Sequence, residues 1–312
     1  MEPNKRFVKT NNRSSLYGTA LLLVAAFIVL ILLFIGFTAL LPSLMGRCVA
    51  VVNVDMPISI EGQPSTLFSS GYAGSEQVAS VVESLNARDD VGAVVFVFNS
   101  PGGSVVATRE IYSTVKSLNK PKVSYFREMA ASGAYYIASG TDYIVSDPDA
   151  ITGSIGVVAT FTDMSGLLDK LGVNITEVTS GPHKDIGSSS RPMTDEEHTI
   201  VRALIEEVFA EFKDTVVKNR GTKLDSALFA EVLDGRIISG RQAKAVGLVD
   251  ATGSKRDAII KAADMANISY NGVDDIRICE VPTSTEQGGL FGADALFRAL
   301  NLNAGFPKIN YQ

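Results

Sequence analysis

The sequence predicts an α/β protein that contains a mainly parallel sheet and carries one transmembrane helix near its N-terminus. After residue 90, short runs rich in Val, Ile and Phe alternate with amphipathic segments of helical length. This alternation implies repeated right-handed β-α-β crossovers, with strands buried on both faces. Before it lies an uninterrupted apolar segment that is long enough to cross a bilayer.

The predicted strands share a short length and a β-branched or aromatic composition. They are Arg47–Val54, Ala93–Phe98, Lys122–Phe126, Tyr143–Ser146, Ile155–Phe161 and Ile175–Thr179. The predicted helices share an apolar face that repeats every three to four residues. They are Gln77–Ala87, Ser104–Leu118, Ala130–Ser139 and Gly166–Leu171, and the Gly/Ser/Pro-rich stretch Glu61–Ser75 is a predicted loop.

A long helix is predicted to begin at Thr194, because Glu197 completes a capping box with it, and to end before Gly221. Its apolar stripe could pack on the sheet or on a neighbouring subunit. Residues 268–312 show weak periodicity and receive no assignment.

The apolar segment lies within a stretch, Ser14–Gly46, that contains no charged residue. Residues 17–42 are predicted to be a retained transmembrane helix, because the apolar core of a cleaved signal peptide has only about 7–15 residues. Basic residues are concentrated before this segment, which predicts that the N-terminus is cytoplasmic. We therefore expect residues 1–16 in the cytoplasm, an extracytoplasmic domain over 43–267, a C-terminal extension over 268–312, and a location in the cell (inner) membrane.

Charge and composition exclude several classes of function. The first 15 residues carry a net charge of +3 and the remainder carries −9, which argues against a nucleic-acid partner. Cys48 and Cys279 are expected to be structural, and a chain of this size does not need a disulfide to fold. With only two histidines, no metal site is expected, and nothing indicates a cofactor.

Two segments that follow predicted strands have the chemistry of a nucleophilic site. Asn99-Ser-Pro-Gly-Gly103 can expose backbone amides for an oxyanion, although a tight strand-to-helix turn is the simpler interpretation. Ser132 lies among small residues at the start of a helix and can attack a carbonyl carbon, although an N-cap serine is the commoner occurrence.

The candidate bases lie in the polar segment Ser180–Gly187, where Lys184 follows His183. A lysine that acts as a base near neutral pH must titrate well below its ordinary pKa of about 10.4, which burial favours and a free carboxylate opposes. Asp185 must therefore point elsewhere. Sequence spacing does not separate the lysine from the histidine, and Ser154 is a candidate for orienting the base.

Taken together, these motifs resemble the short, single-repeat form of the signal peptide peptidase A family, in the protease branch of the ClpP/crotonase superfamily. The matching segments are Asn99–Gly103, Ala130–Tyr136, Thr152–Gly156, Lys184–Gly187 with Arg191–Thr194, and Asp234–Arg236 with Gly240–Ala243. The resemblance covers roughly residues 48–265 and implies ClpP/crotonase-like repeated ββα units.

The resemblance implies a membrane-anchored serine endopeptidase with a Ser-Lys dyad. Ser132 would attack, Lys184 would take and return the proton, Ser154 would hydrogen-bond the lysine, and His183 would be a bystander. The amides of Gly103 and Gly133, with Gly102, would hold the oxyanion. The implied enzyme degrades remnant signal peptides at the lipid bilayer as a homo-oligomeric ring, in which neighbouring chains share active sites.

Two other functions remain open from the sequence. A crotonase-like enzyme on the same superfamily fold would act on acyl-CoA thioesters, but the membrane anchor argues against it. An inactive membrane scaffold is the second alternative, and the joint presence of Ser132, Lys184 and Ser154 argues against that.

Overall fold

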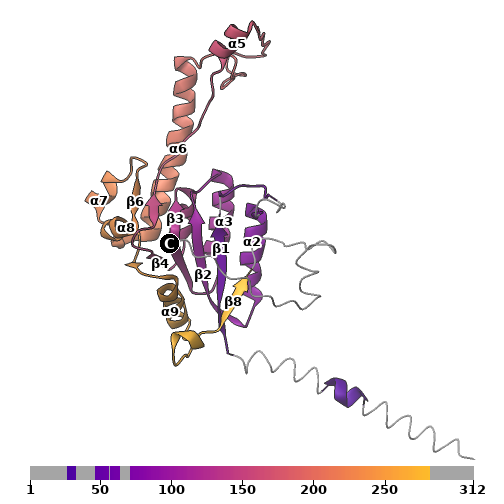
Figure 1. Cartoon of the computed structure of the whole chain (residues 1–312), viewed down its shortest axis with the longest axis vertical. Coiled ribbons are helices and arrows are strands. Elements are labelled where there is room, and N and C mark those ends of the chain that lie inside the picture. Colours follow the sequence, from indigo (N-terminus) through magenta and orange to yellow (C-terminus); the bar gives the residue numbers. More distant parts are fainter. Residues whose placement is uncertain (1–26, 33–45, 56, 64–70, 282–312) are drawn as a thin grey trace, which may run out of the picture.

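The computed structural model of the protein describes residues 27–32, 46–55, 57–63 and 71–281. Its centre is an eight-stranded sheet in the order β6-β5-β3-β2-β1-β8, with β4 pairing with β3 and β7 with β4 (Figure 1). Every pairing is parallel except that of β5 with β6. The strands are β1 (Cys48–Asp55), β2 (Val91–Ser100), β3 (Lys122–Ala131), β4 (Tyr143–Ser146), β5 (Ile151–Gly153), β6 (Ile237–Ser239), β7 (Ala251–Thr252) and β8 (Ile278–Val281).

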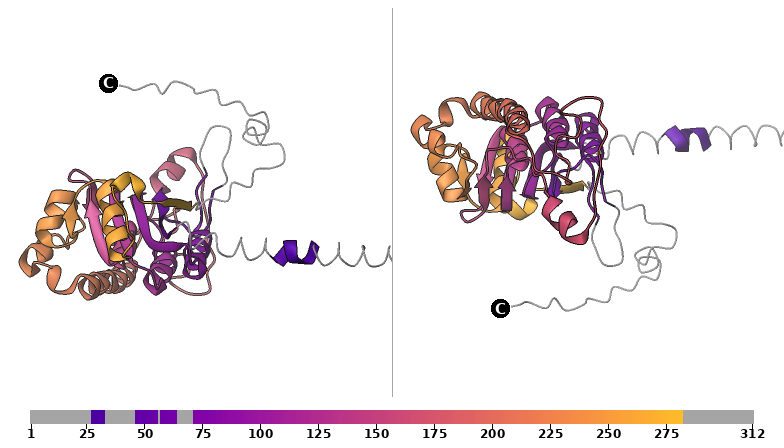
Figure 2. Two further views of the ribbon diagram at one scale, coloured as in Figure 1. Left: turned by 90° about the horizontal axis from the view of Figure 1, so that it is seen from below. Right: turned by 90° about the horizontal axis from the view of Figure 1, so that it is seen from above.

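Helices cover both faces of this sheet. One face packs on α2, α3 and α4, and the other packs on α9. Helices α7 and α8 lie at the end of the sheet opposite to α2 and α3 (Figure 2). The helices are α2 (Ser75–Ser84), α3 (Val105–Ser117), α4 (Gly133–Ser139), α5 (Ser165–Leu171), α6 (Asp195–Arg220), α7 (Ser226–Glu231), α8 (Gly240–Val246) and α9 (Lys255–Met265).

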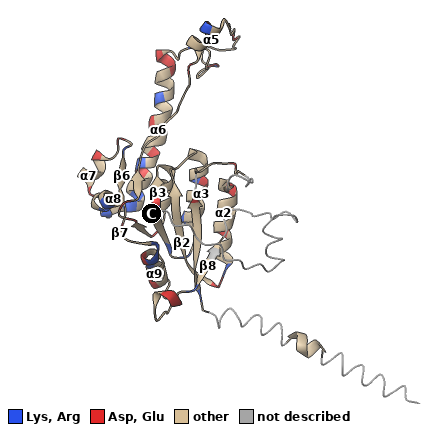
Figure 3. Ribbon diagram, viewed as in Figure 1, with Lys and Arg blue, Asp and Glu red and all other residues tan. Residues whose placement is uncertain are grey.

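The central strands are apolar, as a sheet covered on both faces requires. Residues 91–98 of β2 are all buried and none of them is charged, whereas the helices carry both signs (Figure 3). The predicted α/β class with a mostly parallel sheet is therefore confirmed.

Helix α6 projects from this body and carries α5 near its far end (Figure 1). Its 26 residues span about 39 Å at 1.5 Å per residue. Only its last turns pack on the body, through Phe212 and Val216, whereas Ile200 and Leu204 are exposed. We name the projecting part, residues 157–206, the arm.

A buried ion pair fixes the base of α6. The guanidinium of Arg220 donates to both carboxylate oxygens of Asp250, at 2.9 and 3.1 Å, and to the carbonyl of Gly247. The same carboxylate accepts the amide of Ile144 in β4 and contacts Lys223 Nζ at 2.7 Å. Burial alone would raise the pKa of Asp250, but the hydrogen bonds from Arg220 and Lys223 outweigh it and lower that pKa below its ordinary value.

Two predicted strands are wrong. Residues 155–161 and 175–179 have no regular secondary structure. Ile155 is buried in the core of the body, but residues 157–161 and 175–179 belong to the arm, where Val158 and Val178 are 85% and 95% exposed. Their β-branched composition does not suffice, because strand preference depends on packing against neighbours. The helix predicted from Ala130 begins only at Gly133, because Ala130 and Ala131 extend β3 and pair with β5.

The other predicted elements agree closely with the structure. Strand β4 has the predicted bounds, and the capping box between Thr194 and Glu197 opens α6. Of the predicted transmembrane segment, the structure describes only residues 27–32, which are helical and exposed. Within the described ranges, no helix combines the length and apolarity needed for a membrane span.

Cys48 and Cys279 form a disulfide that joins β1 to β8, with a Cα–Cα distance of 5.9 Å. This confirms that both cysteines are structural. The bond ties β8, in the region without an assigned pattern, to the first strand of the sheet. The two cysteines are 231 residues apart in the sequence, so the bond links the first strand of the sheet to the last.

The ion pair at the base of α6 gives a stability prediction. Asp250→Ala leaves the guanidinium of Arg220, which is 3% exposed, buried without its counterion. The free energy of unfolding should fall by about 3–5 kcal/mol. Urea unfolding of the detergent-solubilised protein measures this. Arg256→Ala, which removes an exposed pair with Asp274, should change it by less than about 1 kcal/mol; equal losses in both variants would contradict the assignment.

Candidate active site

Three turns meet at the carboxyl edge of the sheet. Strands β2 and β5 both pair with β3, with Ser100 opposite Ala130 and Gly153 opposite Ala131. The carboxyl ends of parallel neighbours lie at one edge, so the residues that follow these strands are brought together. The residues brought together in this way are those of the predicted Pro-Gly-Gly turn, Ser132 and Ser154.

Ser132 is held in a conformation that is rare for a residue with a side chain. Its φ is 54° and its ψ is −124°, and its amide donates to the Gly153 carbonyl at 2.9 Å while its carbonyl accepts from Tyr136. Such strain persists only where the surrounding structure imposes it, and it is concentrated at functional sites. Ser132 occupies the N-cap position of α4, but its side chain makes no capping hydrogen bond. The hydroxyl is therefore not used as a helix cap.

The Pro-Gly-Gly turn packs directly on this serine. A Cβ atom at Gly102, whose φ is +94°, would lie 2.7 Å from the Gly133 nitrogen and 2.8 Å from Ser132 Cβ, so only glycine fits. The amide of Gly102 donates to Ser100 Oγ at 3.2 Å. Gly133 is the first residue of α4, where helical geometry leaves its amide without an intrahelical acceptor.

Ser132 opens onto a cavity of about 460 Å³ between the body and α6. The body supplies the predicted residues Gly103, Gly133 and Ser154 to its wall. Apolar side chains form much of the remaining wall, and α6 contributes four of them, Ile205, Val208, Phe209 and Phe212. The predicted nucleophile therefore faces a partly apolar space of the size that ligand sites have.

Ser154 is the second residue of this site with an unusual backbone. Its φ is 49°, and its amide donates to the Arg236 carbonyl at 2.9 Å. Strand β5 ends one residue earlier and pairs with both β3 and β6, which fixes the position of this turn. The structure thus places Ser132 and Ser154 on the same cavity.

Lys184 lies elsewhere. It is exposed, in a turn that contacts the N-terminal end of α6 through His183, whose Nε2 lies 3.5 Å from Glu196 Oε1. The cavity is lined by Glu211, fifteen residues further along the same helix. At 1.5 Å per residue, Glu196 and Glu211 lie about 22 Å apart along α6, and Lys184 is not among the residues that line the cavity. One chain therefore does not bring the predicted base to the predicted nucleophile.

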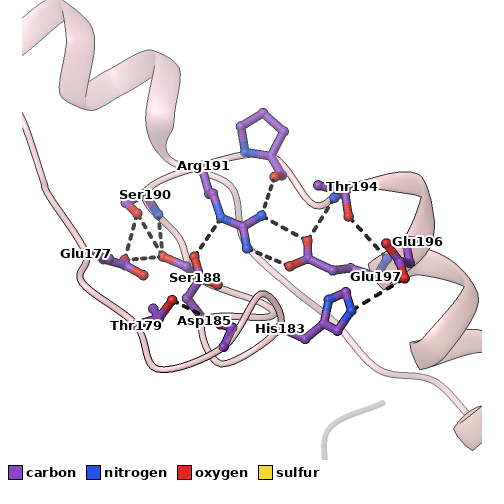
Figure 4. Close-up of polar contacts among 12 residues, drawn as sticks. Glu177, Thr179, His183, Asp185, Ser188, Ser190, Arg191, Thr194, Glu196 and Glu197 are labelled. Carbon is purple, nitrogen blue, oxygen red and sulfur yellow. Dashed lines mark hydrogen bonds and ion pairs between the residues drawn. The ribbon is translucent and has the colours of Figure 1, made fainter.

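Arg191 organises the turn that carries Lys184 (Figure 4). Its Nε donates to Asp185 at 2.8 Å, and its two terminal nitrogens donate to the two oxygens of Glu197, at 2.9 and 2.6 Å. The Glu197 carboxylate also accepts the Thr194 amide. We name this set the Arg191 clasp. It directs Asp185 toward Arg191, which meets the condition that this carboxylate should not neutralise the neighbouring lysine.

The clasp shifts the pKa values of both its carboxyl groups. Hydrogen bonds from Arg191 and from the Thr194 amide lower the pKa of Glu197 to about 2, and a hydrogen bond from Arg191 lowers the pKa of Asp185. The side chain of Glu197 is only 1% exposed. The capping box indicated this glutamate from the sequence, but no signal indicated that it would hold the lysine-bearing turn.

Residues 114–269 match the family model described as Peptidase family S49, and residues 70–145 match the one described as Clp protease. The fold and the site thus define a Clp-protease-like α/β enzyme. The chain belongs to peptidase family S49 and is a protease.

Proteases from archaea and bacteria are similar to this chain over most of its length. The protein assigned as protease MJ0651 of Methanocaldococcus jannaschii is 36% identical over 234 residues, which are 74% of this chain and 72% of that protein. The protein assigned as signal peptide peptidase SppA of Enterococcus faecium is 34% identical over 217 residues, 69% and 62% of the two chains. Protease 4 of Salmonella typhi is 31% identical over 230 residues, 73% and 36%.

The low pKa of Glu197 gives a prediction with a defined sign. A carboxyl whose pKa is lower in the folded than in the unfolded protein stabilises the fold above its unfolded pKa, about 4.3, and loses that effect as the pH falls toward 2. Glu197→Gln should therefore melt below the parent at pH 7, and the difference should shrink between pH 4.3 and 2. Thermal melts over this range measure it.

Glu196→Gln is the matched control, because this neighbouring side chain is 76% exposed and contacts only His183 among the described residues. It should melt with the parent at each pH. A difference between parent and Glu197→Gln that stays constant from pH 7 to pH 2.5 would contradict the role of the charged carboxylate.

Proposed function

We propose that this protease is a membrane-anchored serine endopeptidase whose Ser-Lys dyad is completed between neighbouring copies of the chain. The observation that carries the proposal is that the predicted serines and the predicted lysine lie at different positions along α6. Ser132 and Ser154 line one cavity, whereas Lys184 is exposed in the turn at the N-terminal end of α6 and is not among the residues that line that cavity. A ring of copies, as expected from the sequence, would bring the arm of one copy to the cavity of the next.

The four predicted site residues that line the cavity, Ser132, Ser154, Gly103 and Gly133, each have a role in this mechanism. Ser132 Oγ attacks the peptide carbonyl while its proton passes to Lys184 Nζ of the neighbouring copy, and the lysine then gives that proton to the leaving amine. Ser154 hydrogen-bonds the lysine and orients it. The amides of Gly103 and Gly133 stabilise the oxyanion, whereas the amide of Gly102 is already engaged by Ser100.

The surface of the arm supports assembly with a second copy. Large apolar side chains are exposed along it, including Val158, Val178 and Leu204. Exposed apolar surface of this kind is typical of protein interfaces. Burial beneath a neighbour would also lower the pKa of an amine in the interface, as a lysine base requires.

Remnant signal peptides are the substrates that fit this arrangement best. Such peptides are apolar and lie in the membrane, and the cavity offers apolar walls from both α3 and α6, among them Val105 and Phe209. The proposed anchor over residues 17–42 would keep the cavity near the bilayer. The similar protein from Enterococcus faecium is assigned by name as a signal peptide peptidase.

The disulfide supports an extracytoplasmic catalytic domain. Disulfides form and persist in oxidising compartments and are rare in the cytosol. The bond between Cys48 and Cys279 would therefore form after residues 43–267, together with the following segment that carries Cys279, cross the membrane. A cytoplasmic N-terminus, at residues 1–16, agrees with the basic residues there.

Mixing two inactive variants tests the shared site. Ser132→Ala and Lys184→Ala should each lose at least about a thousandfold of the activity on a fluorogenic apolar peptide. In rings assembled from equal amounts of both, a site is complete where an intact serine meets an intact lysine. Activity should then recover to about one quarter of the parental value.

His183→Ala is the control and should keep the parental rate, because His183 faces Glu196. Mixed rings that stay inactive would show that each site needs both residues from one chain. An active Lys184→Ala together with an inactive His183→Ala would assign the base to the histidine.

Thiol labelling tests the compartment. Protein extracted from membranes with a membrane-permeant alkylating agent present should contain no alkylated cysteine until it is denatured and reduced, because both thiols are in the disulfide. The reduced protein should then take up two labels. Cysteines that are alkylated without reduction would contradict an oxidising location for this domain.

A further inference from the structure

One buried hydroxyl beside the cavity has no hydrogen-bond partner in the part of the chain that the structure describes. Thr108, in the first turns of α3, is 4% exposed, and its Oγ1 is buried without a partner among the described residues. An unpaired buried hydroxyl costs about 1–3 kcal/mol. Thr114, on the same helix, avoids this cost by donating to the Glu110 carbonyl at 3.1 Å. Thr108 is therefore an exception that local helix geometry does not explain.

Thr108 lies beside the residues of the candidate active site. It lines the same cavity as Ser132 and Gly133. A Cβ atom at Gly133 would lie 2.4 Å from Thr108 Oγ1 and 3.3 Å from its Cγ2, so the threonine packs directly against the α carbon of Gly133. The hydroxyl hydrogen rotates freely, and it lies beside the residue whose amide is assigned to the oxyanion.

We propose that Thr108 donates a hydrogen bond to the oxyanion as a third donor beside the amides of Gly103 and Gly133; this rests on the proposed function. The free enzyme offers this hydroxyl no acceptor among its described residues. An acceptor arises when the attacked carbonyl oxygen becomes negative. Hydrogen bonds to a charged oxygen are about twice as strong as neutral ones, and a donor held in place before the reaction needs no reorganisation.

Thr108→Val tests this, because valine keeps the shape and removes only the hydroxyl. The kcat of the detergent-solubilised full-length protein on a fluorogenic apolar peptide should fall about 100-fold to 1000-fold, as for other single oxyanion donors. The KM should change little, because the bond forms only in the transition state. The melting temperature should not fall, because no hydrogen bond of the free enzyme is lost.

Two variants separate catalysis from packing. Thr108→Ser keeps a hydroxyl and should retain most of the parental kcat. Thr114→Val removes a hydroxyl that is bonded in the free enzyme, so it should melt below the parent and keep the parental kcat. Parental kcat in Thr108→Val would overturn the proposal. The proposal would also be overturned if Thr108→Val and Thr108→Ser lost kcat equally and both melted below the parent. That result would assign the loss to packing rather than to the hydroxyl.

Ser132→Ala in the same assay distinguishes this proposal from the one on which it rests. Retained activity in Ser132→Ala would refute the serine mechanism itself. Loss of activity in Ser132→Ala, with parental kcat in Thr108→Val, would leave the mechanism in place and refute only the role of Thr108.

Discussion

The rigid length of α6 is the constraint on which the rest of the site depends. A helix of 26 residues cannot fold back, so the turn at its N-terminal end stays apart from the cavity, which residues from Ile205 to Phe212 in the middle of the helix line. The buried pair of Arg220 and Asp250 fixes one end of this helix to the sheet, and the Arg191 clasp fixes the lysine-bearing turn to the other. The two proposed half-sites, the cavity with Ser132 and the turn with Lys184, thus face different surroundings.

Both half-sites are held by backbone geometry and charge rather than by direct contact with each other. At the cavity, the close approach of Gly102 and Gly133 and the positive φ of Ser132 fix the backbone of the proposed nucleophile before any substrate binds. On the arm, Asp185 is engaged by Arg191, so it is directed away from a role as counterion to Lys184. Assembly of copies would then need to supply only the burial of the amine and its approach to the hydroxyl.

The sequence predicted well which residues meet at the edge of the sheet, because their meeting depends on local rules. The strands before Asn99 and Ser132 have an unambiguous apolar composition, and parallel strands end at one edge. It predicted the arm poorly. Residues 155–161 and 175–179 have the composition of strands, but residues 157–161 and 175–179 lie along a helix that leaves the body and have no sheet to join. Whether α6 packs on the body depends on contacts that no periodicity reveals.

Two other features lay beyond sequence reasoning for physical reasons. The pairing of Cys48 with Cys279 depends on β8 lying beside β1, and β8 is a short strand in a weakly patterned region. Thr108 resembles any other threonine in a helix, and only its missing partner and its contact with Gly133 single it out. Both depend on which residues meet across the fold rather than along the chain.

An experimental structure of the assembled full-length protein in detergent would test the central claim most directly, through one distance. The account predicts that Lys184 Nζ of one copy lies within about 3 Å of Ser132 Oγ of a neighbouring copy and is shielded from water there. A lysine that is solvated in every copy, or that reaches the serine of its own chain, would contradict it.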